Sequence, residues 1–308
     1  MKIENHFVRR QDHINEEEAK HIRPQYRLKD DLDVEYFQIH SGQSVREAYG
    51  SYMAPIRYPY YFVAMLKQGQ VEINLGLSEF TAEPYALWFA PPRVIYSLLV
   101  SSDHLDAYYF TFSKSFVNLY SESSQFLSTL KLFNQTHQPY LELDQATGTG
   151  LFRRFEELHQ EFQHQKLHQQ QLIVTEVKSI LLKTDRLFCE KYDQLPEETK
   201  MRAHLLHRFK ALIETHYAQR WPIQQYAEQL NVHPNYLNRV VKKESGKTSS
   251  ALLDERIILE AKSLLVQTDL SASEIAYQLN FSEPSHFYRF FKTRTGLTAQ
   301  NFRKERKV

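Results

Sequence analysis

The sequence predicts an α+β chain of two domains, in which an antiparallel β domain with following helices precedes an all-helical domain. Short aromatic and β-branched segments recur between residues 58 and 112, and the chain after about residue 200 lacks them. The length of 308 residues also suits two domains, because a domain usually spans about 100–200 residues. With 42% hydrophobic and 24% charged residues, the composition is that of an ordinary globular protein, so both domains can bury a core.

The predicted strands of the first domain are separated by turn residues. They read YYFVAML, VEINLGL, YALWFAPP, VIYSLLV and DAYYFTF, and Gln68-Gly69-Gln70 forms a turn after the first. Gly or Pro at such short intervals favours an antiparallel barrel or jelly roll over a parallel sheet. We expect this barrel over about residues 30–145.

Two amphipathic helices are expected over about residues 150–192. Leu151, Phe155, Leu158 and Phe162 recur at helical spacing, and a later segment carries another apolar stripe. The polar break that follows contains Pro196. We therefore divide the chain into a first domain (1–192), a linker (193–200) and a second domain (201–308).

The charge is unevenly distributed along the chain. Residues 201–308 hold 17 Lys and Arg against 10 Asp and Glu, a balance of +7, and the first 200 residues hold 21 against 27, a balance of −6. A basic second domain favours a polyanionic partner, although chance clustering on a solvated surface is the alternative. One cysteine, no segment of signal-peptide character and no long apolar run predict a cytoplasmic protein.

An internal repeat carries the functional prediction. YAEQLNVHPNYLNRVVKKESGKT aligns with IAYQLNFSEPSHFYRFFKTRTGLT, and each copy reads as helix, tight turn, helix. Ala227 and Ala276 suit a close helix crossing, and Asn231 and Asn280 tolerate the left-handed conformation of a turn. Gly246 and Gly296, together with a capping box begun by Ser271, mark helix ends.

The second helix of each copy has one apolar and one polar face. Leu237, Val240 and Val241 define the buried side of 234–243, as Phe287, Phe290 and Phe291 do for 283–292. Arg reads guanine and Asn reads adenine by paired hydrogen bonds, whereas Lys contacts phosphate. The expected base-reading residues are Asn235, Asn238, Arg239, Ser285, Tyr288 and Arg289, and the expected phosphate contacts are Lys242, Lys243, Lys247, Lys292 and Arg294.

The predicted helix 249–266 connects the two copies. Eighteen residues at ~1.5 Å each give about 27 Å, and its end turns bring this close to the ~34 Å between successive major-groove faces. One chain is thus predicted to read two adjacent groove segments of double-stranded DNA. Either polar helix alone is also compatible with an ordinary surface helix.

Residues 205–303 resemble the AraC/XylS family of transcription regulators, above all in IAYQLNFSEPSHFYRFFKTRTGLTAQNFR, which is close to the family signature. The resemblance implies seven helices that bind ~17–20 base pairs in two consecutive major grooves. It also places base contacts on Asn235, Asn238, Arg239, Ser285 and Arg289. Asn280, Ala299, Val241 and His233 depart from the family pattern.

The first domain looks like the cupin-type sensor domain of this family. The resemblance implies a small effector inside the barrel, a homodimer through the helices that follow, and contact with RNA polymerase. The candidate pocket residues are Tyr58, Tyr60, Phe62, Trp88, Tyr96 and Tyr108, and the candidate dimer stripe is Ile173, Val177, Ile180 and Leu181. Packing of that stripe onto its own barrel, and of the aromatic residues into an ordinary core, are the alternatives.

A metal-dependent cupin enzyme fused to a DNA-binding module is the second hypothesis. Such a site needs clustered His and carboxylate ligands, typically with a His-x-His pair, and the chain has no such pair. His164 and His168 share a helix face but lie in a Gln-rich tract. No catalytic motif stands out, so we expect no enzyme activity, no metal and no cofactor.

Overall fold

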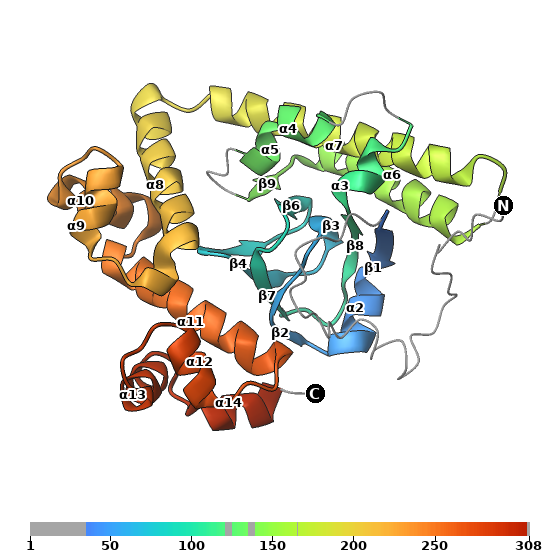
Figure 1. The fold of residues 1–308 in the computed structure, drawn as a ribbon. Helices are drawn as coiled ribbons and strands as arrows, with labels where there is room; N and C mark the ends of the chain where they lie inside the picture. The colour runs from blue at the N-terminus through green and yellow to red at the C-terminus, as the bar shows by residue number, and fades with distance from the viewer. Residues whose placement is uncertain (1–34, 121–124, 135–138, 165, 307–308) are drawn as a thin grey trace, which may run out of the picture.

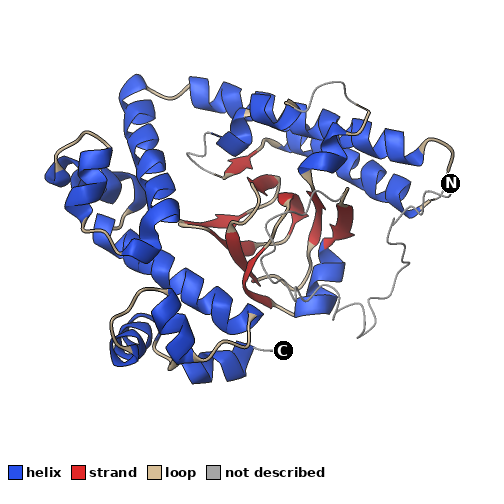
Figure 2. Ribbon diagram, in the orientation of Figure 1, coloured by secondary structure: helices blue, strands red, loops and turns tan. Residues whose placement is uncertain are grey.

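The computed structural model describes residues 35–120, 125–134, 139–164 and 166–306. It shows two antiparallel β-sheets, helices along one side of them, and a separate helical part that follows (Figure 1, Figure 2). The expected barrel start near residue 30 lies outside the described residues. Within the described part of the chain, no helix has the length and apolar character needed to cross a membrane.

The nine described strands form a five-stranded and a four-stranded sheet. The first has the order β1-β8-β3-β6-β9 and the second β2-β7-β4-β5. The first comprises β1 (Phe37–Ser41), β8 (Asp106–Phe112), β3 (Tyr61–Gln68), β6 (Ala86–Ala90) and β9 (Tyr140–Glu142). The second comprises β2 (Tyr52–Arg57), β7 (Ile95–Val100), β4 (Val71–Leu75) and β5 (Ser78–Ala82).

The prediction of an antiparallel barrel or jelly roll is confirmed in part: the described strands form two antiparallel sheets, but these do not close into a barrel. Each sheet keeps two edge strands, and no described strand pairs from one sheet to the other. Pro55 explains one open edge, because proline lacks the N–H needed to pair on both sides. The register of β2 against β7 shifts between Met53 and Ile56, around this proline.

The two faces of the first sheet belong to two different hydrophobic cores, one under the helices and one between the sheets. Val63, Met65 and Phe110 point to the helices, whereas Phe62 and Ala64 point to the second sheet. The turn between β3 and β4 requires Gly69, whose φ is +108° and where a Cβ would lie 2.6 Å from the carbonyl oxygen of His104. The space between the sheets therefore has its own apolar lining.

Five described helices of the first domain cover the outer face of the first sheet: α3 (Lys114–Asn118), α4 (Phe126–Thr129), α5 (Lys131–Asn134), α6 (Gln145–Gln163) and α7 (Gln169–Asp193). Helix α2 (Gly42–Tyr49) instead contacts β1 and β8, and its residues Gly42 and Val45 line the space between the sheets. Asp144 begins α6 by accepting hydrogen bonds from the backbone N–H groups of Ala146 and Thr147, each at 3.0 Å. Figure 1 shows α6 and α7 lying along the sheets.

The candidate dimer stripe on α7 is covered within the chain. Ile173, Val177, Ile180 and Leu181 are all 0% exposed and belong to the core beneath the first sheet. The stripe packs against the chain's own first sheet. Burial against a sheet and burial in a dimer interface require the same apolar spacing along a helix. Packing onto its own sheet, the alternative of the sequence interpretation, describes the stripe in this structure.

The helical part begins at α8 (Glu197–His216), inside the segment predicted as linker. Pro196 precedes its first turn, where Glu197 and Glu198 favour the positive end of the helix dipole. After a 3-10 turn at Tyr217–Gln219 come α9 (Ile223–Gln229), α10 (Pro234–Ser245), α11 (Ser249–Gln267), α12 (Ala272–Gln278), α13 (Pro284–Thr295) and α14 (Ala299–Arg306). These helices share one core, separate from the two cores of the sheets.

Candidate nucleic-acid interface

The repeat folds into two helix-turn-helix units, α9–α10 and α12–α13. Ala227 and Ala276 are 0% exposed, as expected for close helix crossings. Asn231 and Asn280 adopt φ of +55° and +58°, the left-handed conformation that asparagine tolerates. The two turns therefore have the same local geometry, which fixes each second helix against its first.

The outer face of α10 carries the residues predicted to read DNA. Leu237, Val240 and Val241 are buried, whereas the polar residues Asn235, Asn238, Arg239, Lys242 and Lys243 are exposed. His233 begins the helix by accepting the backbone N–H of Asn235 at 3.2 Å. The guanidinium of Arg239 lies 5.2 Å from the ring centre of exposed Tyr236 and forms no ion pair with the described residues. Its hydrogen-bond donors are thus available to a partner.

Asn238 has a structural role that the sequence did not reveal. Its side-chain oxygen accepts the backbone N–H of Ser249 at 3.0 Å, at the first residue of α11. The bond ties the reading helix to the connecting helix. Because this oxygen already accepts a hydrogen bond within the chain, Asn238 has fewer free polar groups to offer a partner than the sequence suggested.

The second unit presents a matching face on α13. Ser285, Tyr288, Arg289, Lys292 and Arg294 are exposed, and Phe287 and Phe291 are 0% exposed. The Tyr288 hydroxyl bonds to the Ser273 hydroxyl at 2.7 Å, and Arg294 pairs with Asp254.

The expected burial of Phe290 is only partly correct. Phe290 is partly exposed at the edge of the core, where its ring centre lies 5.5 Å from that of Phe281. The guanidinium of Arg220 lies over Phe281, 4.0 Å from its ring centre. This arginine therefore covers the edge of the aromatic cluster.

The connecting helix α11 holds the two units apart. Its 19 residues give roughly 28 Å at ~1.5 Å per residue. Arg256 is 2% exposed and pairs with Glu214 at 2.7 Å and with Glu260 at 2.9 Å, which fixes α11 against α8. In Figure 1, α10 and α13 both lie at the edge of the molecule away from the sheets, on either side of α11.

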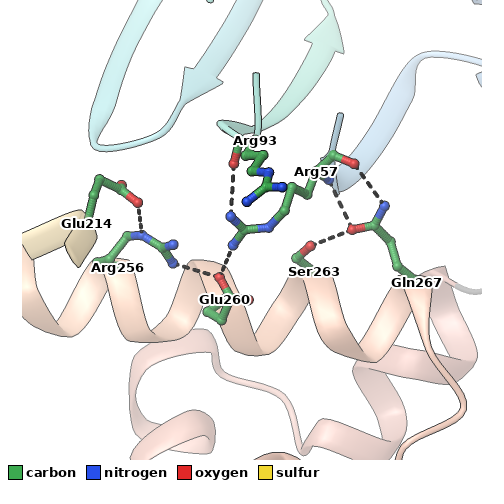
Figure 3. Close-up of polar contacts among 7 residues, drawn as sticks. All are labelled: Arg57, Arg93, Glu214, Arg256, Glu260, Ser263 and Gln267. Carbon is green, nitrogen blue, oxygen red and sulfur yellow. Dashed lines mark hydrogen bonds and ion pairs between the residues drawn. The ribbon is translucent and has the colours of Figure 1, made fainter. Parts of the chain in front are cut away.

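The first domain contacts α11 directly through the end of β2 (Figure 3). The Arg57 guanidinium pairs with Glu260 and donates to the backbone oxygen of Arg93 at 2.9 Å. The side-chain amide of Gln267 accepts the Arg57 backbone N–H at 3.0 Å and donates to the Arg57 oxygen at 3.3 Å. Ser263 donates to the same amide oxygen at 2.7 Å. Helix α11, which connects the two helix-turn-helix units, is therefore hydrogen-bonded and ion-paired to the end of β2 in the second sheet.

A second contact between the domains involves Lys247, one of the residues predicted to contact DNA phosphates. Lys247 pairs with Glu79 of β5 at 3.2 Å and with Glu255 at 2.9 Å. Burial lowers the pKa of Lys247, but the carboxylates of Glu255 and Glu79 outweigh it and raise the pKa overall. Nearby, Lys210 donates to the Ser78 hydroxyl at 3.0 Å, and burial together with the charge of Lys247 lowers its pKa to about 8.

The predicted pocket residues divide between two places. A cavity of about 50 Å³ between the sheets is lined by Tyr58, Phe62, Trp88 and Tyr96, and it also touches Tyr108. The ring of Tyr108 points to the helices, where its centre lies 5.4 Å from that of Phe152. Tyr60 does not line the cavity; it stacks on Tyr36 at 3.7 Å.

His164 and His168, the histidines named for the enzyme hypothesis, and the buried His40 have separate surroundings. Burial, aided by the charge of His159, lowers the pKa of His40 to about 4. Exposed His164 bonds to the backbone oxygen of Gln160, and exposed His168 bonds to Gln171. In the described part of the chain, no three His, Cys, Asp or Glu side chains form a group able to hold a metal ion.

The comparisons with known proteins bear on the helical part. Residues 226–305 match the family model described as a helix-turn-helix domain. The uncharacterized HTH-type transcriptional regulator YtdP of Bacillus subtilis is 33% identical over 85 residues, 28% of this chain and 11% of that protein. The HTH-type transcriptional activator RhaS of Salmonella arizonae is 29% identical over 101 residues, 33% of this chain and 36% of that protein.

A solved structure also matches over this part of the chain. The C-terminal domain of AraT, a response regulator from Geobacillus stearothermophilus, is 30% identical and covers 34% of this chain and 87% of that chain, with a TM-score of 0.33. The matched region spans only about a tenth of the length of YtdP and about a third of the length of RhaS.

The helical part thus belongs to the class of helix-turn-helix DNA-binding domains. Over this helical part, the predicted resemblance to the AraC/XylS family of transcription regulators is confirmed.

Proposed function

We propose that this chain is a sequence-specific transcription regulator that reads two adjacent major-groove segments with α10 and α13. Arg239 and Arg289 are the principal base readers, with Asn235, Ser285 and Tyr288 beside them. Lys242, Lys243, Lys292 and Arg294 contact the phosphates that flank each groove. The role requires no enzyme activity and no cofactor, and it implies a cytoplasmic location.

The observation that carries this proposal is the matched exposure of the two Arg-bearing faces. Helix α10 buries Leu237, Val240 and Val241, and α13 buries Phe287 and Phe291 with Phe290 at the edge of the core. Both helices expose Arg and Lys at equivalent positions of the repeat. The roughly 28 Å of α11 keeps the units close to one groove repeat apart. Two independent surface helices would have no reason to share turn conformation, face and spacing.

The test is a selection of bound duplexes from a random-sequence library with the full chain. We expect enrichment of a site with two short specific blocks about one helical turn apart, ~10 base pairs from centre to centre. Enrichment of one block only, or no enrichment above the starting library, would contradict the proposal.

The first domain, which resembles the cupin type, controls DNA binding through its contacts with the helical part. Lys247 cannot fully neutralise a phosphate while Glu79 holds it, because the carboxylate competes with the phosphate for the same ammonium group. Arg57 and Gln267 hold α11 in one position relative to β2. Release of these contacts by a small effector in the first domain would therefore raise the affinity for DNA.

Glu79→Gln tests this control. We expect the variant to bind the selected duplex more tightly than the unchanged chain, most clearly at low salt, because one of the two carboxylates that compete with phosphate for Lys247 loses its charge and only Glu255 remains. Glu83→Gln is the matched control, since Glu83 accepts a hydrogen bond from Gln70 on the same sheet and contacts no residue of the helical part that the structure describes. Equal affinities of the two variants would remove Glu79 from the control of DNA binding.

Homodimer formation and contact with RNA polymerase stay predictions. The burial of the α7 stripe means that a dimer has to use another surface.

A further inference from the structure

The cavity between the two sheets has an uncharged lining. Aromatic rings from four elements meet there with aliphatic side chains, and none of the residues that line it is Asp, Glu, Lys, Arg or His. The ring centres of Phe62 and Tyr96 lie 5.2 Å apart, and those of Tyr58 and Tyr96 lie 6.3 Å apart. These spacings are those of packed aromatic pairs, so the wall offers flat apolar surfaces.

The polar side-chain groups of the lining residues are the hydroxyls of four tyrosines and the indole N–H of Trp88. Burial raises the pKa of Tyr58 well above its ordinary value, and the neighbouring tyrosines Tyr36, Tyr96 and Tyr109 raise it further. Burial also raises the pKa of Tyr36, which shares a hydrogen bond with Tyr58. The hydroxyls therefore stay neutral, and they can satisfy one or two polar atoms of a ligand.

The ring of His40 stacks against Tyr109 behind this wall, with 5.1 Å between the ring centres. It adds no positive charge at neutral pH, because burial and the charge of His159 lower its pKa to about 4. The wall thus has no cation with which to meet an anion.

This lining selects the chemical class of the ligand. An anion or cation would lose its hydration without gaining a counter-charge, which costs far more than a neutral group. A sugar would leave most of its hydroxyls without partners, and each buried group without a hydrogen bond weakens binding. A flat apolar ring instead gains contacts with the aromatic walls.

We propose that this cavity binds a small, uncharged, mostly apolar ring compound whose single polar atom meets the Tyr58 hydroxyl. The inference rests on the proposed function, in which the first domain senses a small molecule, and it defines the class of that molecule.

The size of the cavity links binding to the contact with α11. Its volume of about 50 Å³ is smaller than the ~150 Å³ of an engineered cavity that binds benzene. A ring therefore has to push the walls apart, and Met53 of the edge strand β2 forms part of one wall. Arg57 lies at the end of the same strand, so displacement of β2 strains its bond with Glu260.

The experiment titrates the full chain with three ring compounds of similar shape: p-cresol, toluene and 4-methylbenzoate. Trp88 lines the cavity, and the chain has only one other tryptophan, Trp221, which stacks on His216 in the helical part. Trp221→Phe therefore leaves Trp88 as the single reporter of fluorescence, and calorimetry gives the affinities independently.

We expect saturable binding of p-cresol and toluene, and binding of 4-methylbenzoate at least about tenfold weaker. Tyr58→Phe should weaken p-cresol about fivefold, the effect of one hydrogen bond, and leave toluene unchanged. Tyr61→Phe is the matched control, because Tyr61 packs on Phe112 and Phe133 on the other side of the sheet.

Equal or tighter binding of 4-methylbenzoate would overturn the inference, and so would the absence of saturable binding of both uncharged rings. DNA binding is measured in parallel without any ring compound. A chain that binds its selected duplex but no ring loses only this inference, whereas a chain that binds the ring but no specific duplex contradicts the proposed function.

Discussion

Replacement of Arg239 by alanine isolates the predicted reading of a base. Arg239 is exposed, and its only described contact is with the ring of Tyr236, which is itself exposed. An exposed cation–π contact stabilises by about 0.5–1 kcal/mol, so little is lost from the free protein. A bidentate arginine–guanine contact contributes about 1–3 kcal/mol, which corresponds to roughly 5- to 150-fold in affinity. Arg289→Ala should behave in the same way in the second unit.

The assay is fluorescence anisotropy with the selected duplex and with a scrambled duplex of equal length. Arg208→Ala is the matched control, because it removes the same charge from an exposed position of α8, which is neither of the two helices proposed to read DNA. We expect Arg239→Ala to lose affinity for the selected duplex only, and Arg208→Ala to change neither affinity by more than about twofold. Equal losses by Arg239→Ala on both duplexes would refute base reading and assign the residue to the phosphate backbone.

Three further outcomes are expected. Lys242→Ala should reduce the slope of log K against log salt by ~0.9, one phosphate contact, and an unchanged slope would remove Lys242 from the interface. Arg57→Ala should speed amide hydrogen exchange in β2 and α11, because the ion pair of Arg57 with Glu260 joins these two elements, but it should not change exchange in α13. An equal increase of the exchange rate in all three elements would contradict this. The neutral form of His40 is favoured in the fold, where its pKa is about 4, so the folded state binds fewer protons than the unfolded state, with its ordinary pKa of 6.5. The melting temperature should therefore fall as the pH decreases from about 6.5 to 4; His40→Gln should flatten this decline and His164→Gln should not.

The helical part could be predicted closely from the sequence because local signals agree there with the packing. Asn231 and Asn280 have the predicted left-handed conformation, and Ser271 forms the predicted capping box with Glu274. The connecting helix ends at Gln267, one residue beyond the expected Val266. Helical periodicity is a property of neighbouring residues, so one sequence is enough to show it.

The sheets were harder to predict because their pairing joins residues far apart in the chain. The strand β2 escaped the sequence interpretation, since Pro55 lies inside it and its position at a sheet edge cannot be recognised locally. For the same reason the sequence could not show that the strands form two separate sheets: alternating residues indicate a strand but not its partner. The α7 stripe shows a related ambiguity, because burial against a sheet and burial against a second chain need the same pattern.

The sequence predicted which residues of the site are exposed, but not the contacts that these residues make within the chain. Arg239 and Arg289 are exposed as expected, because the buried side of a helix determines its polar side. The bond of Asn238 to Ser249, the pairing of Lys247 with Glu79 and the Arg57 contact with α11 depend on tertiary structure. No sequence pattern marks a contact such as that between Arg57 and Glu260, which are 203 residues apart.

The most direct test of two-groove reading changes the distance between the two halves of the selected site. The affinity of the full chain is measured for that duplex and for variants with five or ten base pairs inserted between its halves. Because α11 fixes the separation of α10 and α13, we expect both insertions to lower the affinity to that of a single half-site. Unchanged affinity with five inserted base pairs, which turn the second half to the opposite side of the duplex, would contradict simultaneous reading by one chain.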